Sequence, residues 1–425
     1  MAFPPFQLPS ALLTALCLLL SACGPAPGVN LAISDKARLT ASSAPAADLR
    51  ALTAGNNAFA LDLYQTLRGI DGNLIFSPFS ISLALGMTYA GARGETEAEM
   101  ARALHFDLPE EQLHRAFNQL DLLLASQPET SDEEQRLQLR LANAVWAEET
   151  FAFLPEYLDV LALHYGAGVH LADFIREYEA ARREINRWVS DQTQDRINDL
   201  LPEGVLSSDT RMVLVNAIYF KADWLSQFDK DSTHAAAFHL LDGSEIQVET
   251  MSQGIHVPYV DGEGYQAIEL QYAGGTAAMD IIVPDTGTFT DFEASLDRAR
   301  LDGVLSGLQD SSVLLSLPKF TFSGDFNLSD ALADLGMPLA FDPERADFSG
   351  MTGARDLFIT DVVHKAFVAV DEQGTEAAAA TGVIMGVTSA PAFEITLNVD
   401  RPFIFLIRHS ESDQILFIGR VLDPS

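Results

Sequence analysis

A long run of small residues between two strand-like segments constrains the fold of this chain more than any other feature. Residues 366–370 and 393–399 read as strands, and the residues between them carry no charge after Glu376. The TEAAAA part would suit a helix on its own, because Ala and Glu are good helix formers. Glycines stand before and after it, however, and β-branched residues follow. The mixture within 371–402 predicts an exposed loop that can become extended.

The same loop alternates between two sets of residues. One set is small or apolar throughout, and it comprises Thr375, Ala377, Ala379, Thr381, Val383 and Met385. The interleaved set begins with Glu376, which is the only charge. Because side chains of a strand alternate between two faces, this segment could enter a sheet, burying the first set and exposing Glu376. A loop that stays in solvent does not need that property.

Several segments then resemble one known family. Residues 372–381, EQGTEAAAAT, resemble the hinge of an inhibitory serpin, and residues 397–407, LNVDRPFIFLI, resemble the signature after its reactive loop. Further matches occur in family order along the chain: NLIFSPFSISLAL, LANAVW, INRWVSDQTQDRINDLLP, LVNAIYFKADW, LPKFTFS, DFSGMT and VVHKAFVAVDEQGTEA. Each motif is weak alone, but this many in one order is specific. The resemblance covers roughly residues 50–425.

The resemblance implies an α+β serpin fold with three β-sheets, about eight to nine helices and an exposed reactive-centre loop at about 372–393. We expect one domain over 49–425, for which an apolar content of 48% is ample. Local patterns predict helices at 51–67, 109–126 and 178–192, with two more beginning near Pro78 and Gly94. They predict strands at 136–147, 211–220, 245–251, 265–272, 278–283, 313–317, 403–407 and 415–421.

The N-terminus reads as an export signal. Residues 11–20 form an apolar stretch too short for a transmembrane helix, and the following LSAC resembles a bacterial lipobox. We therefore expect a lipoprotein signal at 1–22 and a lipid on Cys23, although no Lys or Arg precedes the apolar run. An ordinary cleaved signal with an incidental cysteine is the alternative. Residues 23–48 are rich in Pro, Ala, Ser and Gly, which predicts a flexible tether.

Composition and motifs exclude several function classes. The formal net charge is -34, so the surface repels nucleic acid, and no basic cluster suits a polyanionic cofactor. The chain has no G-x-S-x-G, H-E-x-x-H, P-loop or G-x-G-x-x-G motif. Nine histidines are scattered without metal-ligand spacing. We expect a monomeric, exported protein that is not an enzyme and needs neither cofactor nor metal, lying outside the cell or on its envelope.

The resemblance also implies a mechanism. A target protease attacks the reactive loop as bait and forms an acyl-enzyme. The cut loop then inserts into the central sheet, drags the protease across the molecule and destroys the geometry that deacylation needs. Insertion of a serpin loop into its own sheet is a known case of strand addition. The native state is held by a kinetic barrier.

Hinge residues must permit that insertion. Burying a large or charged side chain at an inward position would cost several kcal/mol, whereas the residues present there are small. Gly374 is expected to supply backbone freedom. The hinge comprises Glu372, Gly374, Thr375, Glu376, Ala377, Ala378, Ala379, Ala380 and Thr381. This pattern favours an inhibitor over a non-inhibitory surface binding protein of the same fold.

The family's loop length places the scissile bond after the seventeenth residue counted from Glu372. That residue is Thr388, so the bond is Thr388–Ser389, with Met385 and Val387 as alternative positions. No Lys or Arg occurs from 372 to 400, which disfavours a trypsin-like target. Small residues near the bond favour an elastase-like or subtilisin-like serine protease; a cysteine protease is the alternative target.

Other residues match regions that control opening of the sheet. By the resemblance, Trp224 and Glu372 lie where the loop first enters. A polar cluster under the central sheet is matched by Ser77, Ser80, Asn216 and His364, and such buried groups must be hydrogen-bonded. The expected role of His364 is gating rather than proton transfer. Phe348 and Met351 are expected to serve packing.

Overall fold

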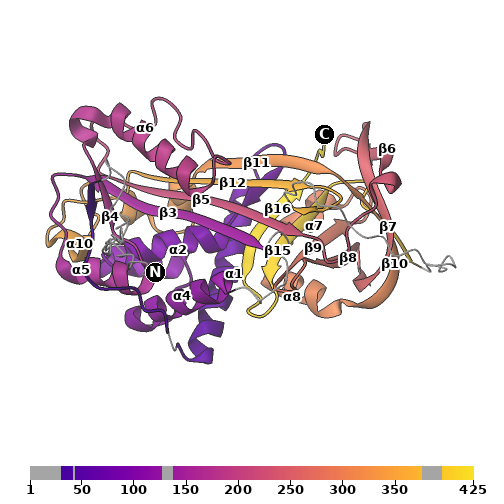
Figure 1. Cartoon of the computed structure of the whole chain (residues 1–425), viewed down its shortest axis with the longest axis horizontal. Helices are drawn as coiled ribbons and strands as arrows, with labels where there is room; N and C mark the ends of the chain where they lie inside the picture. The colour runs from indigo at the N-terminus through magenta and orange to yellow at the C-terminus, as the bar shows by residue number, and fades with distance from the viewer. Residues whose placement is uncertain (1–29, 42–43, 127–136, 376–394) are drawn as a thin grey trace, which may run out of the picture.

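The computed structural model describes residues 30–41, 44–126, 137–375 and 395–425. A seven-stranded sheet forms its centre (Figure 1). In spatial order its strands are β1 (Asn30–Ala32), β4 (Val169–Ala172), β3 (Gln138–Glu148), β5 (Met212–Asp223), β13 (Gly374–Thr375), β12 (Asp361–Val370) and β11 (Phe320–Asn327).

The remaining strands of the described residues pair into a second network of nine. Its order is β14 (Ile395–Asn398), β10 (Gln309–Pro318), β7 (Glu245–Gly262), β8 (Tyr265–Gln271), β9 (Ala277–Pro284), β15 (Phe403–His409), β16 (Ile415–Val421) and β2 (Leu74–Phe76), with β6 (His234–His239) on β7. Strand β7 has 18 residues and pairs with β6, β10 and β8 in turn. Because β7 is long enough to pair with all three, it joins them into one hydrogen-bonded network.

Ten α-helices lie in the described residues, against the eight to nine expected. They are α1 (Ala46–Leu67), α2 (Pro78–Tyr89), α3 (Gly94–Ala103), α4 (Glu110–Ala125), α5 (Pro155–Val160), α6 (Phe174–Gln192), α7 (Phe289–Ala294), α8 (Arg298–Gly307), α9 (Ser329–Asp334) and α10 (Ser349–Thr352). Short π or 3-10 turns are η2 (Leu161–Tyr165), η3 (Lys230–Ser232) and η4 (Pro338–Phe341). Four α-helices have only four to six residues, which is too short for a helical repeat of apolar residues to be recognised in the sequence. Within the described residues, no helix is both long and apolar enough to cross a membrane.

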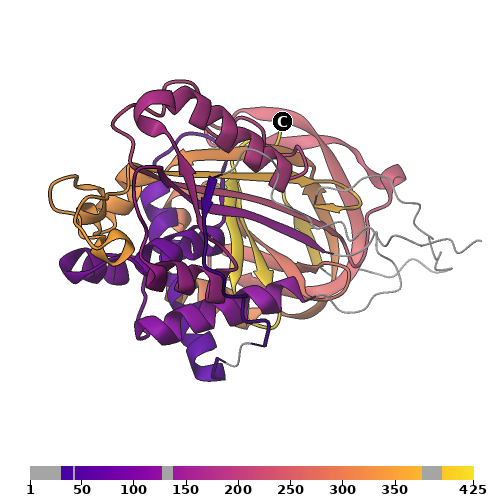
Figure 2. The same ribbon diagram turned by 60° about the vertical axis from the view of Figure 1, so that its left-hand side comes forward.

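Helices and the second network cover the two faces of the central sheet. Helix α6 lies across one face, and β15 and β16 pass behind the other, as both views show (Figures 1 and 2). Aromatic pairs join the two sheets: the ring centroids of Phe220 and Phe417, and those of Phe320 and Phe405, are 5.7 Å apart. The main core therefore lies between the sheets, beside α1 and α2.

The turn from β2 into α2 forms as its sequence predicts. The hydroxyl oxygen of Ser77 accepts a hydrogen bond from the Ser80 backbone N–H at 3.2 Å, and Pro78 occupies the first helical turn. All twelve residues of α2 are buried. The cap thereby fixes the polar start of α2 beneath the central sheet.

The structure shows that residues 30–41 are not part of a flexible tether. The sequence assigned them to a flexible tether, but β1 pairs antiparallel with β4 at the sheet edge. Lys36 binds Asp159 at 2.6 Å, and Arg38 binds Asp121 at 2.5 Å. Within this composition, residues 30–33, NLAI, are mostly apolar, and the unpaired edge of a sheet can recruit such a run as a strand. Gly168 allows β1 to lie this close, because a Cβ at residue 168 would lie 2.5 Å from the Ala32 carbonyl oxygen.

Candidate functional site

The candidate site is the seam between β5 and β12 in the central sheet. Over residues 361–366 of β12 and 213–218 of β5, the two strands pair directly and in parallel. At the other end β13 stands between them, with Thr375 opposite Val370 on one side and Ala222 on the other. Two residues of the loop thus already occupy the place where an additional strand would insert.

Thr375 faces inward, as the period-two pattern predicted. It is 1% exposed, and its hydroxyl lies 2.7 Å from the hydroxyl of Tyr272. The Tyr272 ring stacks on Trp224 with centroids 4.6 Å apart and planes 8° apart. A small side chain fits this enclosed position, whereas a long cation would lose its water without gaining a partner.

Gly374 is required for space. A Cβ at this position would lie 2.1 Å from the carbonyl oxygen of Ala222, which is part of the backbone of β5. The residue is not among those with positive φ. Gly374 was expected to supply backbone freedom, but what requires a glycine here is the close approach of two strands.

Trp224 holds the turn that leads into β13. Its backbone N–H donates to the Gln373 carbonyl at 2.8 Å, and its indole N–H donates to the Asp371 carbonyl at 3.0 Å. The backbone N–H of Phe228 donates to the Glu372 carbonyl at 2.9 Å. Residues 371–373 are thereby fastened to the end of β5 and to the loop after it.

Glu372 forms an ion pair inside this turn. Its carboxylate is 2.9 Å from Lys319 Nζ and accepts a hydrogen bond from the Thr233 hydroxyl at 2.9 Å. Burial raises the pKa of Glu372, but hydrogen bonds from Lys319, from its own backbone and from Thr233, with the charge of Lys319, lower it overall. The group is thus held as a carboxylate. We call Thr375, Tyr272, Trp224, Glu372 and Lys319 the entrance contacts.

A second set of side chains crosses the seam where β5 and β12 pair directly. His364 on β12 bonds through Nδ1 to the amide oxygen of Asn216 on β5. The Asn216 amide nitrogen then donates to the Ser80 hydroxyl and to the Asn143 amide oxygen, each at 2.6 Å. We call Ser77, Ser80, Asn143, Asn216 and His364 the central polar cluster. A strand entering here would have to separate His364 from Asn216.

His364 is neutral in this cluster. Its Nε2 accepts a hydrogen bond from the Ser77 backbone N–H at 3.1 Å, which assigns the ring proton to Nδ1. Complete burial lowers its pKa to about 3. The imidazole therefore acts as a fixed donor and acceptor bridging the seam and α2 at neutral pH.

Some expected site residues lie outside the described part of the chain. These are Cys23, Glu376, Ala377, Ala378, Ala379, Ala380, Thr381, Met385, Val387, Thr388 and Ser389. Phe348 and Met351 are both fully buried, as expected for packing residues. Among the residues the structure describes, no group of three His, Cys, Asp or Glu side chains is placed to hold a metal ion.

Sequence reasoning missed four contacts of the site. Asn143 lies directly opposite Asn216 in the pairing of β3 with β5, and aligning the two predicted strands could have revealed it. Tyr272, Thr233 and Lys319 come from separate strands and loops. No local pattern marks them, because each reaches the site only after the two sheets pack.

Comparison with known proteins agrees with this architecture. The family described as "Serpin (serine protease inhibitor)" matches residues 54–424. An uncharacterized serpin-like protein of Thermococcus kodakarensis is 41% identical over 371 residues, covering 87% of this chain and 84% of the relative. Leukocyte elastase inhibitor A of Mus musculus is 40% identical over 385 residues, covering 88% and 99%.

A solved structure shares the fold. The native state of tengpin, a thermophilic serpin, superposes with a TM-score of 0.80 at 29% identity, covering 92% of this chain and 97% of that one. The family description names inhibitors of proteases rather than catalysts. Protease inhibition is therefore the activity that relationship supports at family level.

Proposed function

Because the chain belongs to the serpin family, we propose that it is a suicide-substrate inhibitor of serine proteases. One observation carries the proposal: Gly374 and Thr375 already stand between β5 and β12, at the open end of the seam. The residues that follow would continue this strand after cleavage.

The proposed mechanism uses the seam as the receptor for the cut loop. The protease serine attacks the bait and forms an acyl-enzyme, from which water would normally release the loop. Extension of β13 along β5 and β12 adds backbone hydrogen bonds and buries small side chains of the hinge. If insertion outruns hydrolysis, the protease is displaced and its oxyanion and acid–base geometry is lost.

The proposed target is elastase-like or subtilisin-like. The bond is assigned to Thr388–Ser389, with Val387 and Met385 as alternatives for the residue before it. The absence of Lys and Arg from 372 to 400 argues against a trypsin-like primary pocket. The mouse relative named leukocyte elastase inhibitor A supports the elastase-like choice.

We also propose that the protein is exported and tethered by a lipid on Cys23, facing the outside of the cell or its envelope as a monomer. The LSAC sequence before and at Cys23 supports the lipid, and the acidic composition makes nucleic acid an unsuitable partner. Mass spectrometry of the membrane fraction tests the anchor. An N-terminal peptide starting at an unmodified residue other than Cys23 would overturn it.

The decisive experiment mixes the mature protein with an elastase-like serine protease. Denaturing gel electrophoresis should show a stable complex, and mass spectrometry should show a released peptide that begins at Ser389. A cut loop without any complex, across elastase-like, subtilisin-like and chymotrypsin-like proteases, would exclude suicide inhibition of serine proteases. A complex with a cysteine protease alone would favour that alternative target, and no cut by any protease would favour a non-inhibitory binding protein.

A further inference from the structure

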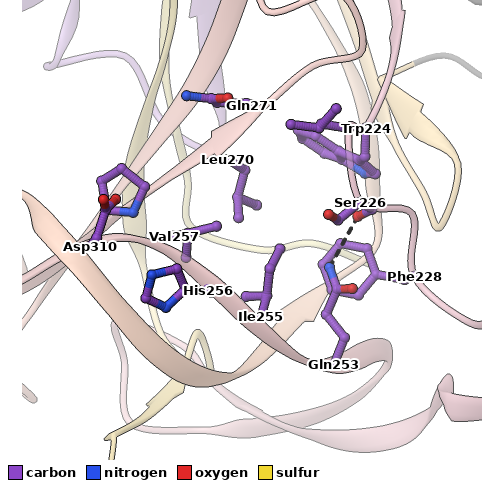
Figure 3. Close-up of a pocket in the computed structure, with 12 residues that line it drawn as sticks. Trp224, Ser226, Phe228, Gln253, Ile255, His256, Val257, Leu270, Gln271 and Asp310 are labelled. Carbon is purple, nitrogen blue, oxygen red and sulfur yellow. Dashed lines mark hydrogen bonds between the residues drawn. The ribbon is translucent and has the colours of Figure 1, made fainter. Parts of the chain in front are cut away.

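A small pocket lies behind the entrance contacts. The loop after β5, the middle of β7, the end of β8 and Asp310 at the start of β10 line an open pocket of about 170 Å³ (Figure 3). Engineered protein cavities of about 150 Å³ bind a single aromatic ring. The volume therefore suits a molecule of one or two rings rather than a drug-sized or hormone-sized ligand.

The lining separates into an apolar part and a polar part. Phe228, Val257 and Leu270 are buried, at 5%, 8% and 3% exposed, and form an apolar wall. Figure 3 shows Trp224 and Phe228 on one side of the pocket and Asp310 and His256 on the opposite side. An apolar body with a few convergent polar groups is the usual arrangement of a small-molecule site.

The charges of the lining favour a cation. Among the lining residues, all within the described part of the chain, Asp310 supplies a carboxylate and none is Lys or Arg. The whole chain carries a net charge of -34, which attracts cations and repels anions.

Two residues of the pocket also hold the turn at residues 371–373, which leads into the hinge. Trp224 donates to the carbonyls of Asp371 and Gln373, and Phe228 donates to that of Glu372. A molecule packed against Trp224 and Phe228 would stabilise the loop after β5 in the arrangement that fastens residues 371–373. Because coupling between a ligand and a conformation is reciprocal, that ligand would oppose the movement of this turn.

From these observations we propose that the pocket binds a small aromatic amine and that its occupancy slows entry of the reactive loop into the sheet. The binding half stands on the pocket alone, whereas the regulatory half rests on the proposed function. The amine would lie toward Asp310, and the ring between Leu270 and Trp224.

Calorimetric titration with tryptamine tests the binding half, with indole-3-acetate as the probe of similar ring and opposite charge. Tryptamine should bind at one saturable site and more tightly than indole-3-acetate. Replacing Asp310 with Asn should weaken tryptamine roughly two- to fivefold, the range for an exposed charge pair. Asp330→Asn on α9 makes the same charge change at an exposed position and should leave the affinity unaltered. Equal affinities for both probes, or no saturable heat, would overturn the proposal.

Two variants that close the pocket locate the site. Val257→Trp fills the cavity, and Ser226→Trp covers its mouth from an exposed position, so the second variant tests the site even if the first misfolds. Both should abolish tryptamine binding. Binding retained by a folded Ser226→Trp variant would place the amine elsewhere and refute the assignment.

The regulatory half is measured on the same protein with its target protease. Saturating tryptamine should increase the fraction of loop that is cleaved without trapping, and Ser226→Trp should remove the response. Tryptamine binding without any change in trapping would overturn the coupling. Tryptamine binding by a protein that traps no protease would overturn the proposed function while leaving the site intact.

Discussion

The two ends of the β5–β12 seam are held by different chemistry. At the entrance contacts, β13 already separates the strands, and a partly exposed cation, Lys319, pairs with a buried carboxylate, Glu372. In the central polar cluster, the strands pair directly, and the neutral, fully buried side chains of Asn216 and His364 bridge them. One end is therefore open and charged, and the other is closed and uncharged.

This difference assigns different tasks to the two ends. At the entrance contacts, the buried carboxylate of Glu372 is held by Lys319 and Thr233, so these contacts specify where the loop begins to insert. Buried neutral networks are costly to leave unsatisfied, so the central polar cluster resists separation of the strands. Substitutions at the two ends should consequently change different observables, with the largest effect at the inward hinge position.

Replacing Thr375 with Arg should produce the largest effect. The position is 1% exposed and faces Tyr272, so an unpaired cation there would destabilise β13 between β5 and β12, and oppose its extension, by several kcal/mol. The variant should be cleaved by the target protease as a substrate, with trapping reduced at least about tenfold on denaturing gels. Thr375→Ser, which keeps a small hydroxyl, should still trap. Equal trapping by the Arg variant and the parent would rule out loop insertion.

Replacing His364 with Ala should have the next largest effect. It leaves the Ser77 N–H and the Asn216 amide oxygen without their partner and opens a cavity, which together cost roughly 3 kcal/mol. Thermal unfolding of the native state should shift down by several degrees, and incubation should yield more oligomers on native gels. Lys365→Gln, next along β12 but paired with exposed Asp325, is the matched control. A His364→Ala variant no less stable than this control would contradict the role of the central polar cluster.

Replacing Glu372 with Gln should have a smaller effect. It removes the charge that Lys319 and Thr233 contact, at a cost of about 1.5–3 kcal/mol for a hydrogen bond to a charged group. We expect a modest fall in the native unfolding temperature and faster spontaneous insertion. A double-mutant cycle with Lys319→Met measures the coupling. Strictly additive effects would mean that the ion pair does not act as a unit.

The smallest effect should come from mild acid. His364 has a pKa of about 3 when folded and about 6.5 when unfolded, so the unfolded chain binds the extra proton between these values. Its contribution to stability is complete above about pH 6.5 and is lost as pH falls toward 3. At pH 5.5 the loss is about 1 kcal/mol.

A His364→Gln variant isolates this contribution. His164 and His170, each with a pKa lowered to about 4 mainly by burial, act in the same direction, and Asp280, raised to about 6 by burial, acts in the opposite one. All three groups are present in both proteins, so the difference between their pH–stability curves reports His364. Parallel curves from pH 7 to 5.5 would exclude His364 as the source.

Much of the fold could be predicted from the sequence, because strands and long helices leave local periodicity. The strand predicted at 211–220 is observed as β5 (Met212–Asp223), and the helix predicted at 178–192 falls within α6 (Phe174–Gln192). Short helices and the length of β7 were missed, since neither produces a distinctive local period. Residues 30–41 were wrongly assigned to a tether, because the strand they contain forms only by pairing with the edge of β4.

The residues of the candidate site could likewise be predicted in part from the sequence, whereas other features required the structure. Sequence pattern and resemblance named Gly374, Thr375, Trp224, Asn216 and His364, because small inward residues and ordered motifs are properties of the chain itself. Only the tertiary structure decided why Gly374 must be glycine, since the obstacle is the backbone of a strand some 150 residues earlier.

The sequence by itself thus determined which segment can become a strand and which residues can cap, pack or alternate. The tertiary structure alone decided which partners those residues meet: Lys319 for Glu372, Tyr272 for Thr375 and Asn143 for Asn216. The physical reason is that period and propensity act between neighbours in the chain, whereas an ion pair or a seam between strands exists only after distant segments have packed together.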